Sequence, residues 1–63
     1  MYYLITILNV NNSDAWKEPY NDFNKAAKRI KKLRYSSKLQ VIDIECSCTD
    51  DEQQLWNYYN NGY

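Results

Sequence analysis

The side chains best suited to covalent chemistry in this 63-residue chain are two cysteines and two closely spaced carboxylates. Cys46 and Cys48 have no partner that could activate a thiolate, because the chain contains no histidine. Asp43 and Glu45 have the spacing of an acid–base pair on one face of a strand, but such a pair on an open sheet is ordinarily just solvated. We therefore expect no catalytic site and no enzymatic activity.

The same cysteines do not make a metal site. Structural zinc needs four ligands, commonly a Cys-x-x-Cys pair and two more, whereas this chain has one Cys-x-Cys pair and no histidine. Two positions apart on a strand, the thiols would lie about 6.6 Å apart along the chain, which is poor geometry for a disulfide. We expect no metal, no cofactor and two reduced thiols, which is typical of a cytoplasmic protein.

Charge is segregated along the chain although it sums to zero. Seven of the eight cations lie within residues 25–38 with no acid among them, and five of the eight acids lie within residues 43–52 with no cation. The acidic segment suits a basic groove of another protein, and the basic segment suits nucleic acid or an acidic protein. Either run is also compatible with an ordinary solvated face.

Aromatic residues are too numerous for the core of so small a domain: seven tyrosines, two tryptophans and one phenylalanine. Tyrosine and tryptophan are frequent anchors of protein interfaces. We expect Trp16 and Tyr20 to cap the end of the core, and Trp56 and Tyr58 to serve a partner. The predicted protein-binding residues are acidic or aromatic: Asp43, Glu45, Asp50, Asp51, Glu52, Trp56 and Tyr58. The alternative, a nucleic-acid surface, uses four cations: Lys25, Lys28, Arg29 and Lys32.

Three elements can be read from hydrophobic spacing. Residues 2–10 form an apolar, β-branched and aromatic run that predicts a strand, followed by a turn at 11–14 and a loop that carries Trp16. A helix capped by Asn21 should follow Pro19 and end within residues 34–37. Residues 39–48 alternate and predict a second strand. The helical stripe has i, i+3, i+4, i+7 spacing: Phe23, Ala26, Ala27, Ile30 and Leu33.

The tail has two interpretations. In the preferred one, Thr49 to Glu52 form a turn and residues 53–59 form a third strand, since tryptophan and tyrosine favour strands. In the alternative, Thr49 is the N-cap and Glu52 the third residue of a capping box that begins a short helix reaching Tyr59. Asn60-Asn61-Gly62 is a conventional stop in both.

These elements predict a single α+β domain over residues 1–63. The preferred order is β-α-β-β, a three-stranded antiparallel sheet of order 1-3-2 that is half of a ferredoxin-like fold, with one amphipathic helix on one face. The alternative is β-α-β with a short C-terminal helix. We expect the helix to cover an inner sheet face made by four isoleucines: Ile5, Ile7, Ile42 and Ile44.

One helix covers one face, so the other face should stay exposed. A domain of this size buries only about 60% of its unfolded surface and gains from association. We therefore expect a homodimer with the first strand or the uncovered face at a two-fold interface. The predicted interface residues are Tyr2, Leu4, Thr6 and Leu8.

The apolar start of the chain is too short to be a membrane segment. It carries no basic residue before the run and ends at Asn9, well below the ~18 apolar residues of a span. We expect neither a signal peptide nor a membrane anchor.

The order strand, lysine-rich helix, Val41-Ile42-Asp43-Ile44 strand and then Leu55-Trp56-Asn57-Tyr58 before Asn60-Asn61-Gly62 resembles small early proteins of phages that infect low-GC Gram-positive bacteria. Lysine, asparagine and tyrosine enrichment strengthens the resemblance, which extends over most of the chain. Several such proteins are anti-defence factors, compact and often dimeric inhibitors that occlude a host immune nuclease, helicase or CRISPR effector. The resemblance implies a stoichiometric inhibitor of a host protein in the bacterial cytoplasm, and it transfers no individual site residue.

Overall fold

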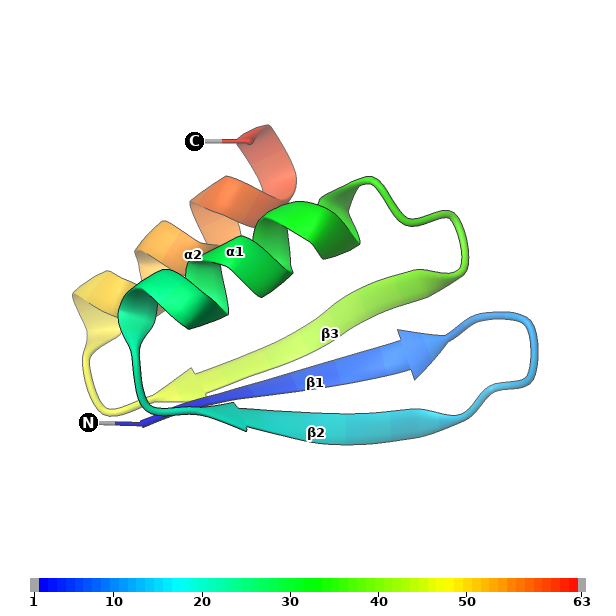
Figure 1. Ribbon diagram of the computed structural model, residues 1–63, viewed down its shortest axis with the longest axis horizontal. Helices are drawn as coiled ribbons and strands as arrows, with labels where there is room; N and C mark the ends of the chain where they lie inside the picture. Colours follow the sequence, from blue (N-terminus) through cyan, green and yellow to red (C-terminus); the bar gives the residue numbers. More distant parts are fainter. Residues whose placement is uncertain (1, 63) are drawn as a thin grey trace.

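The computed structural model describes residues 2–62 and has an α+β fold, as predicted from the sequence (Figure 1). The elements in chain order are β1 (Tyr3–Asn9), β2 (Ala15–Tyr20), α1 (Phe23–Arg34), β3 (Leu39–Cys46) and α2 (Thr49–Asn61). The three strands form one antiparallel sheet, which confirms the predicted sheet type. No helix among the described residues is long and apolar enough to cross a membrane.

The strand order differs from the predicted 1-3-2. The sheet has the order β2-β1-β3, so β1 is its centre. Ile5, for example, is the register partner of Glu18 on β2 and of Ile44 on β3. The prediction was wrong because the third strand of the sheet is β2. This strand comes from residues that were expected to form a loop, and not from the tail.

A hairpin turn creates β2. The Asn9 N–H donates to the Asp14 carbonyl over 2.7 Å, and the Ser13 N–H donates to the Asn9 carbonyl over 2.9 Å. Ser13 has φ 63°, in the left-handed region, and the Asn12 carboxamide accepts from the Asp14 N–H over 3.0 Å. Pro19 fits within β2 because an edge strand can spare a backbone donor.

Helix α1 follows the predicted stripe, with Ala26, Ala27, Ile30 and Leu33 buried. Its N-cap is Asp22 and not Asn21, since the Asp22 carboxylate accepts the Asn24 N–H over 2.8 Å. Cations occupy its last turn, where the negative end of the helix dipole favours them.

The tail is a helix, so the preferred strand at residues 53–59 was wrong and the alternative was right. Leu55 is completely buried, and the acidic first turn of α2 suits the positive end of the helix dipole. The predicted capping box does not form: Cys48 is the N-cap, without a side-chain hydrogen bond. Gly62, with φ 84°, ends the helix by donating its N–H to the Tyr58 carbonyl over 3.0 Å.

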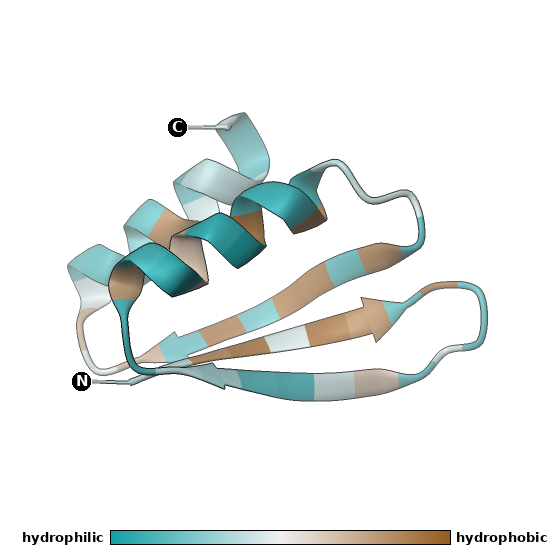
Figure 2. Cartoon of the chain, viewed as in Figure 1, coloured by the Kyte–Doolittle hydropathy of each residue, from teal (hydrophilic) through white to brown (hydrophobic). Residues whose placement is uncertain are grey.

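Both helices lie on the same face of the sheet, and the opposite face is uncovered (Figure 1). Figure 2 shows apolar residues along β1 and β3, and hydrophilic residues on the outer side of α1. The core therefore lies between the sheet and the helix layer. Its buried members are Tyr3, Ile5, Ile7, Ala26, Ala27, Ile30, Leu33, Val41, Ile44 and Leu55.

A bulge in β3 changes which isoleucine reaches the core. Thr6 pairs with Asp43, but the next residue, Ile7, pairs with Val41, so Ile42 is an extra residue. Val41 is 6% exposed and Ile42 is 49% exposed. The prediction that Ile42 packs beneath the helix was therefore wrong, because strict alternation does not continue through a bulge.

Conservative truncation of two isoleucines tests this register. We expect Ile44→Val to lower the free energy of unfolding by about 1 kcal/mol, since Ile44 is 2% exposed. The matched variant Ile42→Val should change it by less than about 0.5 kcal/mol. Urea unfolding followed by tryptophan fluorescence measures both, and equal losses at the two positions would contradict the bulged register.

Candidate protein-binding surfaces

The two helices begin at the same end of the molecule. Strands β2 and β3 both run antiparallel to β1, so their last residues lie at the same end of the sheet. After a two-residue connection each strand is followed by a helix, α1 after β2 and α2 after β3. Carboxylates gather at this end, which we call the acidic end: Asp22, Asp50, Asp51 and Glu52.

Cations gather where α1 ends. Lys31, Lys32 and Arg34 lie in its last turn. The Arg34 side chain also reaches the end of α2. Its guanidinium carbon Cζ would lie 3.4 Å from a Cβ atom placed on Gly62. The charge segregation in the sequence thus becomes a polarity from the beginning to the end of α1, and each sign complements a helix dipole.

Asp51 is tied into the core. The buried Tyr3 hydroxyl donates to its Oδ2 over 2.7 Å, and the Tyr3 ring meets Phe23 edge-on at 5.9 Å between centroids. The hydrogen bond to Asp51, together with burial, raises the pKa of Tyr3 to about 12. Asp51 therefore anchors the first turn of α2 to β1, while Asp50 is exposed and Glu52 is half-buried.

The remaining two acidic residues of the predicted surface lie elsewhere. Asp43 and Glu45 alternate with the buried Ile44, so they point to the uncovered face of the sheet. The Tyr2 hydroxyl lies 3.5 Å from Glu45 Oε2. The sheet therefore divides the predicted acidic surface into two parts.

Trp56 and Tyr58 lie on different sides of α2. Trp56 packs against Tyr59, with 6.1 Å between ring centroids, and the Tyr59 hydroxyl accepts the Val41 N–H of β3 over 3.2 Å. Tyr58 faces α1, between Phe23 and the Lys31 ammonium, which lies 4.4 Å from the ring centroid. The two aromatic residues would share a face on a strand, but they diverge on a helix.

Among the four cations of the alternative surface, Lys25, Lys28 and Lys32 are exposed. Arg29 instead forms a two-pronged ion pair with Glu18, through Nε at 2.9 Å and Nη2 at 3.1 Å. This pairing attaches α1 to the edge strand β2 and removes Arg29 from the free cations of that surface.

Glu18 is the centre of a polar cluster between β2 and α1. Besides Arg29, its carboxylate accepts the Trp16 indole N–H over 2.9 Å and the Tyr20 hydroxyl over 2.7 Å. Burial raises the pKa of the Glu18 carboxyl, but the hydrogen bonds from Trp16, Arg29 and Tyr20 outweigh it and hold the pKa below its ordinary value. Burial and the hydrogen bond to Glu18 raise the pKa of Tyr20.

The four predicted dimer residues all lie on the uncovered face. Tyr2 is 51% exposed, and Leu4, Thr6 and Leu8 are half-buried between the neighbouring strands. Lys17 also lies on this face, beside Thr6. Lys17 was not among the predicted residues because a loop was expected between the turn at 11–14 and the helix, although the alternation of Trp16, Glu18 and Tyr20 is typical of a strand.

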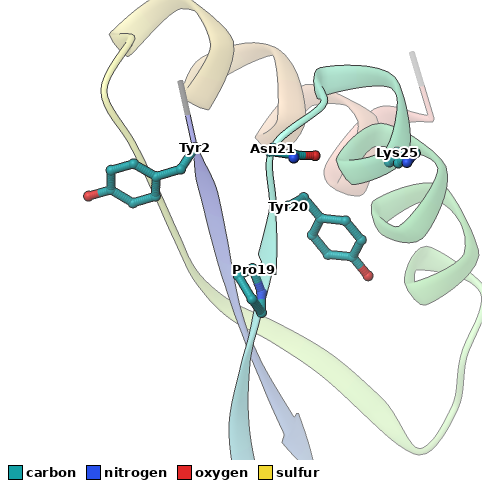
Figure 3. A pocket seen from close by; sticks show the side chains of 5 residues that line it. All are labelled: Tyr2, Pro19, Tyr20, Asn21 and Lys25. Atoms are coloured by element: carbon teal, nitrogen blue, oxygen red, sulfur yellow. The ribbon is translucent and has the colours of Figure 1, made fainter.

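An open hollow lies where β2 meets the start of α1, lined by Tyr2, Pro19, Tyr20, Asn21 and Lys25 (Figure 3). The Tyr2 and Tyr20 side chains extend to different sides of the sheet edge, so the polar groups do not converge on one point. A small-molecule site needs such convergence.

The Cys46 thiol is bound by the backbone of Cys48. The Cys46 thiol donates to the Cys48 carbonyl, with 3.0 Å between sulfur and oxygen, and burial raises the pKa of this thiol. Within residues 2–62 no group of three or more histidine, cysteine, aspartate or glutamate side chains could hold a metal ion.

Comparison with protein-family models, with curated proteins and with solved structures found no match to this chain. The surfaces described above are therefore the basis for assigning a function.

The Tyr3–Asp51 hydrogen bond predicts a loss of stability at alkaline pH. The pKa of Tyr3 is about 12 in the folded chain and 10.0 ordinarily, so its contribution is complete below pH 10 and is lost as the pH rises from 10 to 12. Tyr3→Phe should remove this part of the pH dependence of unfolding. Tyr35→Phe is the control because Tyr35 is 79% exposed, and an unchanged alkaline profile in Tyr3→Phe would contradict the assignment.

The Glu18 cluster predicts the opposite pH dependence. A carboxyl whose pKa is lowered on folding stabilises the fold above its ordinary pKa, and this stabilisation is lost as the pH falls through the lowered value. Glu18→Gln should cost about 1 kcal/mol of unfolding free energy at neutral pH, and the cost should shrink in acid. Urea unfolding over a pH series measures it, with Glu45→Gln as an exposed control. A constant difference at every pH would refute the charged role of Glu18.

Proposed function

We propose that this chain is a phage-type protein that binds and inhibits a bacterial host protein, an anti-defence factor that occludes an immune nuclease or helicase complex without turnover. The proposal rests on the resemblance drawn from the sequence and on the state of the carboxylates. Its setting would be the host cytoplasm.

The proposal depends on carboxylates that have no ion-pair partner in the fold. Within residues 2–62 the ion pair between Arg29 and Glu18 is the single one. Among residues 2–62, no cation lies at ion-pair distance from any of the five acidic side chains in the segment 43–52. The chain nevertheless has as many basic as acidic residues. Carboxylates left without partners in the fold are available to cations of another molecule.

The first turns of α2 offer the better protein-binding surface. Asp50 is exposed, and Glu52 lies one helical turn before Trp56, so these two side chains share one side of the helix. A half-buried tryptophan beside the Glu52 carboxylate combines an apolar anchor with charge that steers association, and the exposed Asp50 adds a second charge in the first turn. We define the α2 surface as Asp50, Glu52 and Trp56.

A nuclease or helicase channel is a suitable target for this surface. Such channels track a phosphate backbone with positive charge, so they attract an acidic protein. The domain measures 31 × 21 × 16 Å, which is small enough to sit in or across such a groove. Blocking the groove needs binding alone, which fits a chain without a histidine.

Nucleic-acid binding through α1 is the alternative function. Lys25, Lys28 and Lys32 are exposed along one helix, and three phosphate contacts would give weak, salt-sensitive affinity. The restraint of Arg29 by Glu18 makes this surface weaker than the sequence suggests.

Charge neutralisation separates the two functions. The double variant Asp50→Asn, Glu52→Gln should weaken binding to the host protein by about tenfold, because two charge-assisted contacts are lost. The matched control Lys25→Gln, Lys28→Gln removes two exposed charges of the opposite sign and should bind like the parent. Calorimetric titration against a nuclease or helicase captured from a bacterial lysate measures both affinities. If the lysine variant loses function and the acidic variant keeps it, the alternative holds.

The mode of inhibition is tested by titration against the enzyme's activity. Occlusion predicts a linear loss that is complete at equivalence and does not increase with incubation time. Inhibition that progresses with time at substoichiometric protein would contradict it.

A further inference from the structure

The uncovered face of the sheet carries a charge pattern that runs across the strands. Register partners define rows: Lys17, Thr6 and Asp43 form one, and Pro19, Leu4 and Glu45 form the next. The β2 side of the face is therefore basic at Lys17, the β3 side is acidic at Asp43 and Glu45, and β1 between them is apolar apart from Thr6. A third row contains Ala15, Leu8 and Gln40.

This pattern is complementary to itself under one particular two-fold rotation. An axis lying in the interface and running along β1 places β1 on β1, and places β2 of each copy over β3 of the other. Because Lys17 and Asp43 belong to the same row, the rotation brings Lys17 of each copy opposite Asp43 of the other, twice per dimer. Leu4 and Leu8 meet their own copies at the centre.

A two-fold axis across the strands has the opposite result. It places β2 on β2 and β3 on β3, so lysine faces lysine and the acidic residues face each other. Like charges opposed across an interface cost several kcal/mol, so the pattern discriminates between the two arrangements. Two aligned sheets pack at about 30°, which an axis some 15° from β1 provides.

We propose that a second copy of this chain docks on the uncovered face through the two-fold axis along β1, with Lys17 paired to Asp43 of the other copy. The dimer covers two exposed large apolar side chains, Tyr2 just before β1 at 51% and Ile42 on β3 at 49%. It leaves the α2 surface free on both copies, because α2 lies on the opposite side of the sheet. The dimer proposal is therefore independent of the proposed host target.

The size of the face sets the strength of association. Three strands about 4.8 Å apart and about 20 Å long give a footprint of about 300 Å² per copy. This is small beside the ~800 Å² of accessible surface per partner in a standard interface. We therefore expect a dissociation constant in the micromolar range, and the concentration series must extend to about 1 mM.

Charge exchange at Lys17 and Asp43 tests the axis. Sedimentation equilibrium should show a monomer–dimer equilibrium for the parent, weakened about tenfold or more by either Lys17→Glu or Asp43→Lys alone. An equimolar mixture of the two variants should dimerise to within about threefold of the parent, since both contacts become lysine–carboxylate pairs again.

The matched control is Lys28→Glu, which makes the same charge change on the outer side of α1 and should leave dimerisation unaltered. Circular dichroism of each variant confirms that it folds. A parent that stays monomeric at about 1 mM overturns the proposal, and so does a dimer whose charge variants are not rescued by mixing.

Discussion

The position of β1 between two antiparallel neighbours is the constraint on which the rest of the structure depends. Its inner side chains, Tyr3, Ile5 and Ile7, are buried and form the floor of the core. Because β2 and β3 run in the same direction, both helices start at one end of the sheet. Both also return over the same face (Figure 1). The other face then has no element of this part of the chain to cover it.

The same constraint explains the distribution of charge. Because both helices start at the same end of the sheet, the positive ends of their dipoles lie at that end. The carboxylates of the acidic end stabilise these positive dipole ends. Charge at this end therefore has a structural role, and a binding role only where a side chain remains available. Asp22 caps α1 and Asp51 binds Tyr3, which leaves Asp50 and Glu52. The uncovered face has its own charges, with Lys17 on β2 and Asp43 on β3 on either side of Thr6.

Much of the fold could be predicted from local pattern, and the errors have physical causes. The stripe from Ala26 to Leu33 identified α1, and the apolar run identified β1. Strand β2 was missed because a loop was expected between the turn at 11–14 and the helix, although an edge strand accommodates Pro19. Trp56 and Tyr58 suggested a strand, yet Leu55, Tyr58 and Tyr59 have helical spacing around a buried leucine. The acidic residues could be named, but their division between two faces depended on α2, whose form the sequence left open.

Both edges of the sheet are closed to further strands. On β2, Pro19 lacks the backbone donor that a neighbouring strand would use. On β3, the extra residue Ile42 breaks the ladder, and the Tyr59 hydroxyl already occupies the Val41 N–H. Growth by edge-to-edge addition, the route to open-ended fibres, is thereby obstructed. In the proposed dimer, one second copy covers the flat side of the sheet, so assembly would end at two chains.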